Sequence, residues 1–163
     1  MYGWIHTCLE KLVLTRFGEE TWQKIKTEAQ CPVKNGDWIR YENYTDGQTF
    51  ALVGASCKVL NLDMDTILEV FGSYFMEYVR DEGYLTMLRL LGSNLREWLT
   101  NVNDLHKHLK NSLPDATFPD FWVAEDEEPD GIHESMILHY YSHVSNLMYY
   151  RYLYLYIEYL YSY

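Results

Sequence analysis

The sequence has little positive charge. Its 163 residues include 13 Lys and Arg against 24 Asp and Glu, which gives a formal net charge of −11 at pH 7. Proteins that bind nucleic acid or anionic membrane surfaces need clusters of Lys and Arg, so this balance argues against both classes of partner. We interpret the acidity as a contribution to solubility.

Cysteine is also scarce, and no segment has the properties of an export or lipidation signal. Cys8, Cys31 and Cys57 are odd in number and widely spaced, so they form neither a disulfide framework nor a metal-ligand spacing. The first residues, MYGWIHTCLEKL, lack the basic start and long apolar run of a signal peptide, and Gly3 stands one position too late for myristoylation. We therefore expect a cytoplasmic protein with no membrane partner.

Hydrophobic residues make up 48% of the chain, which is enough for one domain with a core, in two lobes. Apolar residues at helical spacing, bounded by Gly, Pro and capping residues, predict helices through the first two thirds. The expected helices are residues 1–14, 19–29 and 50–60, a helix from Asp63 or Asp65 to near Gly83, and residues 94–109. Residues 33–48 are expected to form a loop, in which a short strand or a helical turn stays open.

After Pro114 the pattern changes. Phe118–Val123 and Ser135–Ser142 are rich in aromatic and β-branched residues, which predicts two strands, and the acidic segment EDEEPDG between them predicts a turn. The expected fold class is α+β, with a mainly helical N-terminal lobe followed by a small antiparallel β lobe. A two-stranded hairpin is marginal alone, so it must pack on helices or pair with further strands.

The helix expected at Asn94–Leu109 carries one histidine on its apolar stripe. Asn94 is a candidate N-cap, and Glu97 would complete a capping box. His106 lies on the apolar face, whereas His108 points to the polar face. A buried imidazole needs a partner. From the residues alone, a backbone carbonyl in the core is the commoner partner, and a bound metal stays open as the other.

Several segments match one known family in order along the chain. They are MYG at the start, LVGASCKVLNL at 52–62, FG at 71–72, EGY at 82–84, LGSNLREWLTNVNDLHKHL at 91–109, Pro-x-Phe at 119–121 and LHYYS at 138–142. From residue 1 to about residue 143 the chain resembles the H-NOX haem domain, in particular the N-terminal domain of soluble guanylate cyclase beta subunits. The resemblance implies a haem-based gas sensor, with haem b between the helical and β lobes.

The resemblance also implies a regulatory domain rather than an enzyme. The full protein would be a guanylate cyclase signalling protein, with a cyclase subunit as partner. The sequence itself has no nucleophile and base in an arrangement that supports a catalytic site.

The resemblance assigns roles to residues of both lobes. His106 corresponds to the axial ligand of the haem iron, and Pro119 to a proline that packs against the porphyrin and bends it. Ile5, Phe75 and Val79 correspond to the distal pocket. Because these side chains are apolar, they offer no hydrogen bond to bound oxygen. The implied ligand is nitric oxide, with oxygen and carbon monoxide as alternatives.

The family's Tyr-x-Ser-x-Arg motif, which holds the haem propionates, is incomplete in this chain. Tyr140 and Ser142 match the motif, whereas the arginine position is Val144. Loss of that cation would weaken haem binding by about 1.5–3 kcal/mol, the typical contribution of a hydrogen bond to a charged group.

Residues 144–163 differ from everything before them, because eight of the last fifteen residues are tyrosine. Arg151, Glu158 and the shortness of the run argue against a membrane span. Val144–Ser145 is also how a GTAAGT splice donor would be translated. We hypothesise that this tail is intron read-through rather than evolved protein, which would leave a truncated H-NOX domain at 1–143. An uninterrupted transcript across this junction would overturn the hypothesis.

Two alternative functions stay open. A haem-poor interaction or dimerisation module of a cyclase subunit follows if Val144 prevents haem retention. An oxygen sensor follows if the tail is genuine, because Tyr149 or Tyr150 then lies near the position of a distal tyrosine, and a phenol can donate to bound oxygen.

Overall fold

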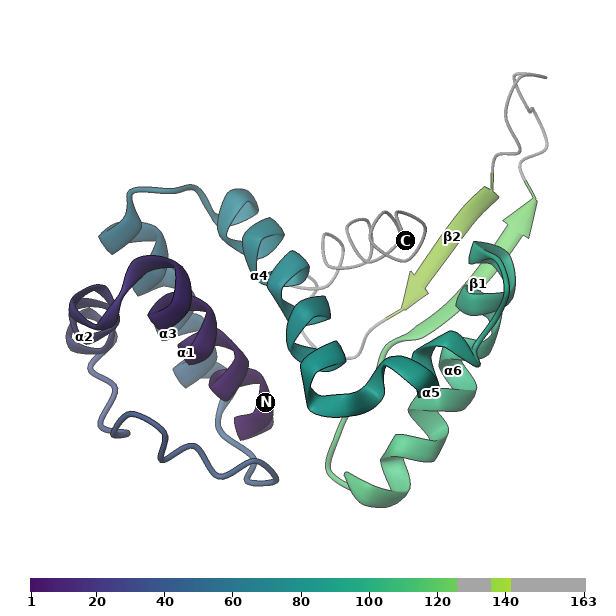
Figure 1. Cartoon of the computed structure of the whole chain (residues 1–163), viewed down its shortest axis with the longest axis horizontal. Coiled ribbons are helices and arrows are strands. Elements are labelled where there is room, and N and C mark those ends of the chain that lie inside the picture. The colour runs from purple at the N-terminus through teal and green to yellow at the C-terminus, as the bar shows by residue number, and fades with distance from the viewer. Residues whose placement is uncertain (126–135, 142–163) are drawn as a thin grey trace. The chain divides into compact units, whose positions relative to one another are not determined.

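The computed structural model describes residues 1–125 and 136–141 (Figure 1). The chain divides between Glu82 and Gly83 into two compact units. The described ranges contain six α-helices, one π-helical turn and two antiparallel strands, so the predicted α+β class is confirmed. Within these ranges, no helix has both the length and the apolar character needed to cross a membrane.

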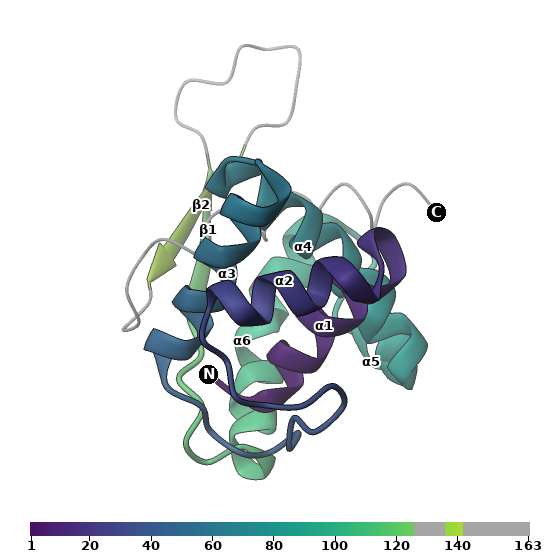
Figure 2. The ribbon, with the colours of Figure 1, turned by 90° about the vertical axis from the view of Figure 1, so that its left-hand side faces the viewer.

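The first unit holds four helices with a shared core. They are α1 (Gly3–Phe17), α2 (Glu19–Glu28), α3 (Asp46–Leu60) and α4 (Met64–Val79). Helices α1 and α3 each pack against both α2 and α4 (Figure 2). Side chains with almost no exposure fill the space between them; these include Cys8, Trp22, Ile25 and Leu52. Burial of this apolar surface is the main force that holds the four helices together.

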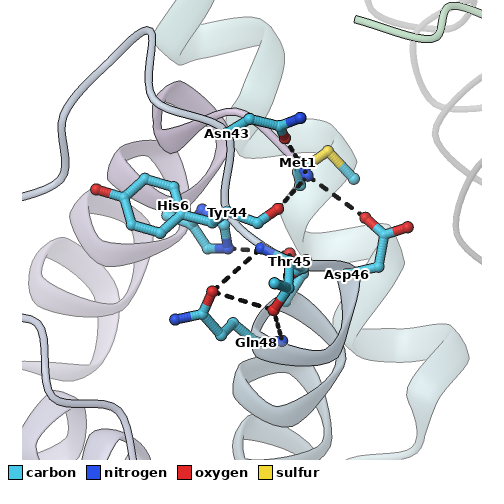
Figure 3. A network of polar contacts seen from close by, with 8 residues as sticks. Met1, His6, Asn43, Tyr44, Thr45, Asp46 and Gln48 are labelled. Carbon is cyan, nitrogen blue, oxygen red and sulfur yellow. Dashed lines mark hydrogen bonds and ion pairs between the residues drawn. The ribbon is translucent and has the colours of Figure 1, made fainter. Parts of the chain in front are cut away.

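Helix α3 begins at Asp46 rather than Phe50, inside the segment expected to be a loop. Its N-cap is Thr45, whose hydroxyl accepts the Gln48 N–H at 3.3 Å, while the Gln48 side chain accepts the Thr45 N–H at 3.1 Å (Figure 3). These bonds form a capping box, which satisfies N–H groups that a helix start leaves unpaired. The loop predicted to reach residue 48 therefore ends at Thr45, and the helical turn left open within it is the first turn of α3.

Other helix ends also differ from the prediction; α6, for example, continues to Ser112, three residues beyond the predicted end. Helix α1 continues to Phe17 and ends at Gly18, where a φ of 83° suits a residue without a side chain. Helix α4, capped by Asp63, ends at Val79 and passes into a π-helical turn, Arg80–Tyr84. The apolar pattern predicts one regular helix to near Gly83, and it carries no signal for the π-helical turn.

The second unit combines helices with the predicted hairpin. Its elements are α5 (Leu85–Arg89), α6 (Leu95–Ser112), β1 (Asp120–Glu125) and β2 (Met136–Tyr141). The strands are antiparallel, with Trp122 opposite His139. The change of composition at Pro114 predicts a lobe boundary there, whereas the structure divides at Gly83, because α6 packs against β1.

The start of α6 confirms half of the predicted capping box. Asn94 Oδ1 accepts the Glu97 N–H at 3.0 Å, as predicted. The Glu97 carboxylate, however, accepts from the N–H and the hydroxyl of Ser93, at 2.8 Å each, so it binds one residue earlier than the N-cap. Trp98, four residues after the N-cap, donates its Nε1–H to the Leu88 carbonyl at 3.1 Å and so attaches α6 to α5.

A polar and aromatic network joins the start of α1 to the start of α3 (Figure 3). The Met1 ammonium donates to the Tyr44 carbonyl at 2.6 Å. His6 is fully buried, and its ring stacks on Trp38 with a centroid distance of 4.5 Å. His6 Nε2 lies 3.0 Å from Thr49 Oγ1, so one imidazole contacts the loop and α3 together.

We expect His6 to make the first unit sensitive to mild acid. Burial, reinforced by repulsion from the Met1 ammonium, lowers the pKa of His6 to about 4. Because the unfolded chain binds this proton near pH 6.5, stability is complete above that pH and falls as the pH drops towards the folded-state pKa. At pH 5 the free energy of unfolding should be about 2 kcal/mol lower than at pH 7.5. Urea unfolding at both pH values measures this difference.

The control for this prediction is His6→Gln, whose amide can bond to Thr49 but cannot titrate. The variant should show a smaller loss of stability between the two pH values. An equal loss in both proteins would contradict the assignment to His6.

Candidate functional site

His106 lies on the face of α6 that meets β1, and its ring is held by a carbonyl and two aromatic rings. Its Nδ1 is 3.0 Å from the carbonyl oxygen of Pro119, a buried residue just before β1. The Phe118 ring stacks on the imidazole with a centroid distance of 4.9 Å, and the Phe121 ring lies at 5.8 Å. The structure therefore brings together two of the predicted site residues, His106 and Pro119.

The bond to Pro119 decides the tautomer of the imidazole. A carbonyl oxygen only accepts, so we assign the proton to Nδ1 of His106, which leaves a lone pair on Nε2. Within the described ranges, Nε2 has no hydrogen-bond partner. Burial lowers the pKa of His106, partly offset by the bond to the Pro119 carbonyl, so the ring is neutral at pH 7. His108 is exposed, in agreement with its predicted direction.

This arrangement fits an axial ligand of haem iron. Metal-ligating histidines use a neutral ring, donate their second N–H to a carbonyl or carboxylate, and keep the other nitrogen for the metal. His106 meets each of these conditions with residues of its own unit. The sequence left two partners open for this imidazole, a backbone carbonyl and a metal. Both are compatible, because the carbonyl uses Nδ1 and a metal would use Nε2.

His6, another buried histidine, has the opposite arrangement. Thr49 Oγ1 can donate to the Thr45 carbonyl at 3.5 Å, so we assign a proton to His6 Nε2, which donates to Thr49. Its Nε2 is thus used in a structural bond. Sequence reasoning did not single out His6, although its place three residues before the buried Leu9 puts it on the apolar face of α1.

Asn103, one turn before His106 on α6, is a second residue that sequence reasoning missed. Its Nδ2 donates to the Phe121 carbonyl at 2.5 Å, and its Oδ1 accepts the Phe121 N–H at 2.9 Å. Asn101 on the same helix is exposed, whereas Asn103 is half-buried. The one sequence signal that separates them is the spacing of three residues between Asn103 and His106.

The residues predicted for the distal pocket all lie in the first unit, on α1 and α4, which pack together. Ile5 and Phe75 are partly buried against the core cluster, and Val79 is buried. The Phe75 ring meets Trp4 edge-on, with a centroid distance of 5.6 Å. The three side chains are thus apolar residues of one helix pair, and their role in a gas pocket stays a prediction.

The predicted propionate clamp falls at the limit of the described residues. Tyr140 lies in β2, with its backbone paired opposite Phe121 in β1. The other predicted positions lie outside the described residues; these are Ser142, Val144, Tyr149 and Tyr150, with the rest of the tail. The contribution of this motif to haem binding therefore stays a prediction.

Comparison with known proteins decides the family. A family model described as haem-NO-binding matches residues 2–152. The chain belongs to this family. Soluble guanylate cyclase gcy-32 from Caenorhabditis elegans is 28% identical over 142 residues, which cover 87% of this chain and 20% of the relative. The beta-2 soluble subunit of guanylate cyclase from Rattus norvegicus is 42% identical over 79 residues, or 48% of this chain and 11% of that subunit.

Solved structures of H-NOX proteins have the same fold. A point mutant of the H-NOX protein from K. algicida, in the unliganded Fe(II) state, matches with a TM-score of 0.65 and 25% identity, covering 77% of this chain and 67% of that one. An Fe(II) H-NOX protein from S. oneidensis matches with a TM-score of 0.68 and 16% identity, covering 86% and 71%, and this likeness concerns the fold alone.

The resemblance to the H-NOX haem domain is thereby confirmed. The chain spans a fifth or less of the length of the two curated relatives named above. It is a haem-based gas-sensing module, and it corresponds to the regulatory part of those relatives rather than to a cyclase catalytic domain.

Proposed function

We propose that this H-NOX domain is a nitric oxide sensor that uses haem b and regulates a soluble guanylate cyclase. The observation that carries the proposal is the state of His106. Its Nδ1–H is bound to the Pro119 carbonyl, its ring is neutral, and its Nε2 is left for a metal. Bound haem b would supply an iron centre that can bind a diatomic gas, and His106 would hold that iron.

Different residues of the chain would bind the haem and select the gas. His106 supplies a single nitrogen ligand, and Phe118 keeps the imidazole plane in one orientation by stacking. Ile5, Phe75 and Val79, in the distal role, would offer no hydrogen-bond donor to a bound gas. Nitric oxide binding does not depend on such a donor, whereas a bound oxygen with superoxide character does, so these residues favour nitric oxide.

The partner and the location are part of the same proposal. The relatives that support it are named soluble guanylate cyclases. A cyclase subunit is therefore the proposed partner, and the cytosol is the proposed location. The three cysteines are free thiols, which agrees with a reducing compartment.

The test is to express the chain with a haem precursor, reduce it without air and record its absorbance spectrum. We expect a Soret band in proportion to protein, a shift of that band with nitric oxide, and no stable change with oxygen. A lasting oxygen complex would instead favour the oxygen-sensor alternative. A wild-type chain without a Soret band would overturn the proposal.

The haem-poor interaction module is kept as a second candidate because of one observation, Val144 at the arginine position of the clamp. In that case the wild-type chain would be colourless, and Val144→Arg should gain haem. The expected gain is about 1.5–3 kcal/mol, or roughly 10- to 150-fold in affinity, from a restored charge-assisted hydrogen bond. Val144→Leu is the matched control, since it changes size without adding a cation.

A further inference from the structure

Asn103 binds both backbone groups of a single strand residue. Its amide donates to the Phe121 carbonyl at 2.5 Å and accepts the Phe121 N–H at 2.9 Å. In a strand, the N–H and C=O of one residue point to the same side. Because both groups of Phe121 meet Asn103, they point towards α6 and away from β2. The side-chain amide thus takes the position that a neighbouring strand would occupy.

The same face of α6 holds the chain at a second point, two residues before Phe121. Asn103 and His106 are three residues apart and therefore neighbours on one helix face. The pairs run in opposite order, Asn103 with Phe121 and His106 with Pro119, so α6 and this segment are antiparallel. The rise is about 4.5 Å between the helix positions and about 6.6 Å along the extended chain. The two spacings are similar, so both contacts can form at once.

From this geometry we infer that Asn103 is a positioning residue for His106. By fixing the backbone of Phe121, its amide holds the Pro119 carbonyl where it accepts the Nδ1–H of His106. That bond in turn keeps the imidazole in the tautomer that presents Nε2. The inference rests on the proposed function, in which His106 ligates haem iron.

The double contact requires an amide. The group must donate to a carbonyl and accept from an N–H at the same time, which asparagine can do with its NH₂ and its oxygen. A carboxylate at this position could accept the Phe121 N–H, but its second oxygen would face the Phe121 carbonyl without a proton to share. Aspartate is therefore close in shape and different in chemistry, which makes it the sharpest substitution.

The test compares Asn103→Asp and Asn103→Ala with Asn101→Ala. Asn101 is a matched control, because its Nδ2 also donates from α6 to a backbone carbonyl, that of Leu91, at 2.6 Å. Each protein is loaded with haem b, reduced and saturated with carbon monoxide. Two rates are measured: haem transfer to excess apomyoglobin, and exchange of the His106 Nδ1 proton with solvent, by NMR of the chain labelled with ¹⁵N-histidine.

Both Asn103 variants should lose haem about 10- to 100-fold faster than wild type, the usual effect of removing a group that orients a metal ligand. The His106 Nδ1 proton should also exchange faster in both. Asn101→Ala should match the wild type in both rates. Asn103→Asp retains one of the two bonds, so it gives an answer even if Asn103→Ala does not fold.

Two results would overturn this inference and leave the proposed function intact. One is that Asn103→Asp loses haem at the same rate as the wild type. The other is faster haem loss with an unchanged Nδ1 proton, because that combination indicates general loosening rather than loss of the positioned bond. A wild-type chain that takes up no haem would overturn the proposed function, and this inference with it.

Discussion

Replacing His106 with alanine abolishes haem binding, and added imidazole restores it: this is the largest effect we expect. The substitution removes Nε2, the nitrogen that the bond to Pro119 leaves for a metal. It also opens a space beside Phe118 and Phe121, whose rings contact the imidazole in the folded chain. Free imidazole fits such a space and can supply the missing nitrogen. Soret absorbance after haem-supplemented expression measures both the loss and the rescue.

The matched control for that experiment is His108→Ala. His108 lies on the same helix two residues later, and it is exposed. Its removal should leave the Soret band unchanged. Haem binding at the wild-type level in His106→Ala would refute the assigned ligand, and an equal loss in both variants would indicate damage to α6 instead.

The largest expected effect on stability comes from Trp98→Ala. Trp98 is 4% exposed, and its Nε1 donates to the Leu88 carbonyl at 3.1 Å. Truncation of a buried tryptophan to alanine typically costs about 3–5 kcal/mol, because apolar contacts are lost and a cavity remains. We expect a loss of that size in the free energy of unfolding, measured by urea denaturation at pH 7.5.

A tryptophan of the same unit provides the control. Trp122 in β1 is 50% exposed, although its ring stacks on His139 with a centroid distance of 5.1 Å. Its replacement by alanine should cost no more than about 1 kcal/mol, since half of the ring already faces solvent. Similar losses in the two variants would show that the burial of Trp98 does not determine the stability of this unit.

The parts of the fold that depend on local signals could be predicted from the sequence. Asn94 caps α6 through the Glu97 N–H, and Asp63 caps α4, as their side chains and positions indicate. The two predicted strands also pair, although β1 runs from Asp120 to Glu125 and so begins and ends two residues later than predicted. The acidic turn predicted between them lies outside the described residues, apart from Glu125. The helical spacing also correctly predicted that His106 faces the interior and that His108 faces solvent.

The details that sequence reasoning missed depend on contacts between distant residues. The partner of His106 Nδ1 is a backbone carbonyl thirteen residues later, and every residue type has a carbonyl, so no residue identity marks it. Asn103 meets Phe121 across eighteen residues. The boundary between the two units was missed for the same reason, since it depends on a contact between distant residues. Only the packing of α6 on β1 shows that this helix belongs with the two strands. Composition, which changes at Pro114, carries no such information.

The contact between Asn103 and Phe121 also limits how this sheet can grow. A strand edge with open N–H and C=O groups readily pairs with another strand, which is a common start of aggregation. At Phe121 both groups are bonded to a side chain, so a new strand cannot pair with β1 on that side at this position. One asparagine thus prevents strand pairing at the Phe121 position of this edge.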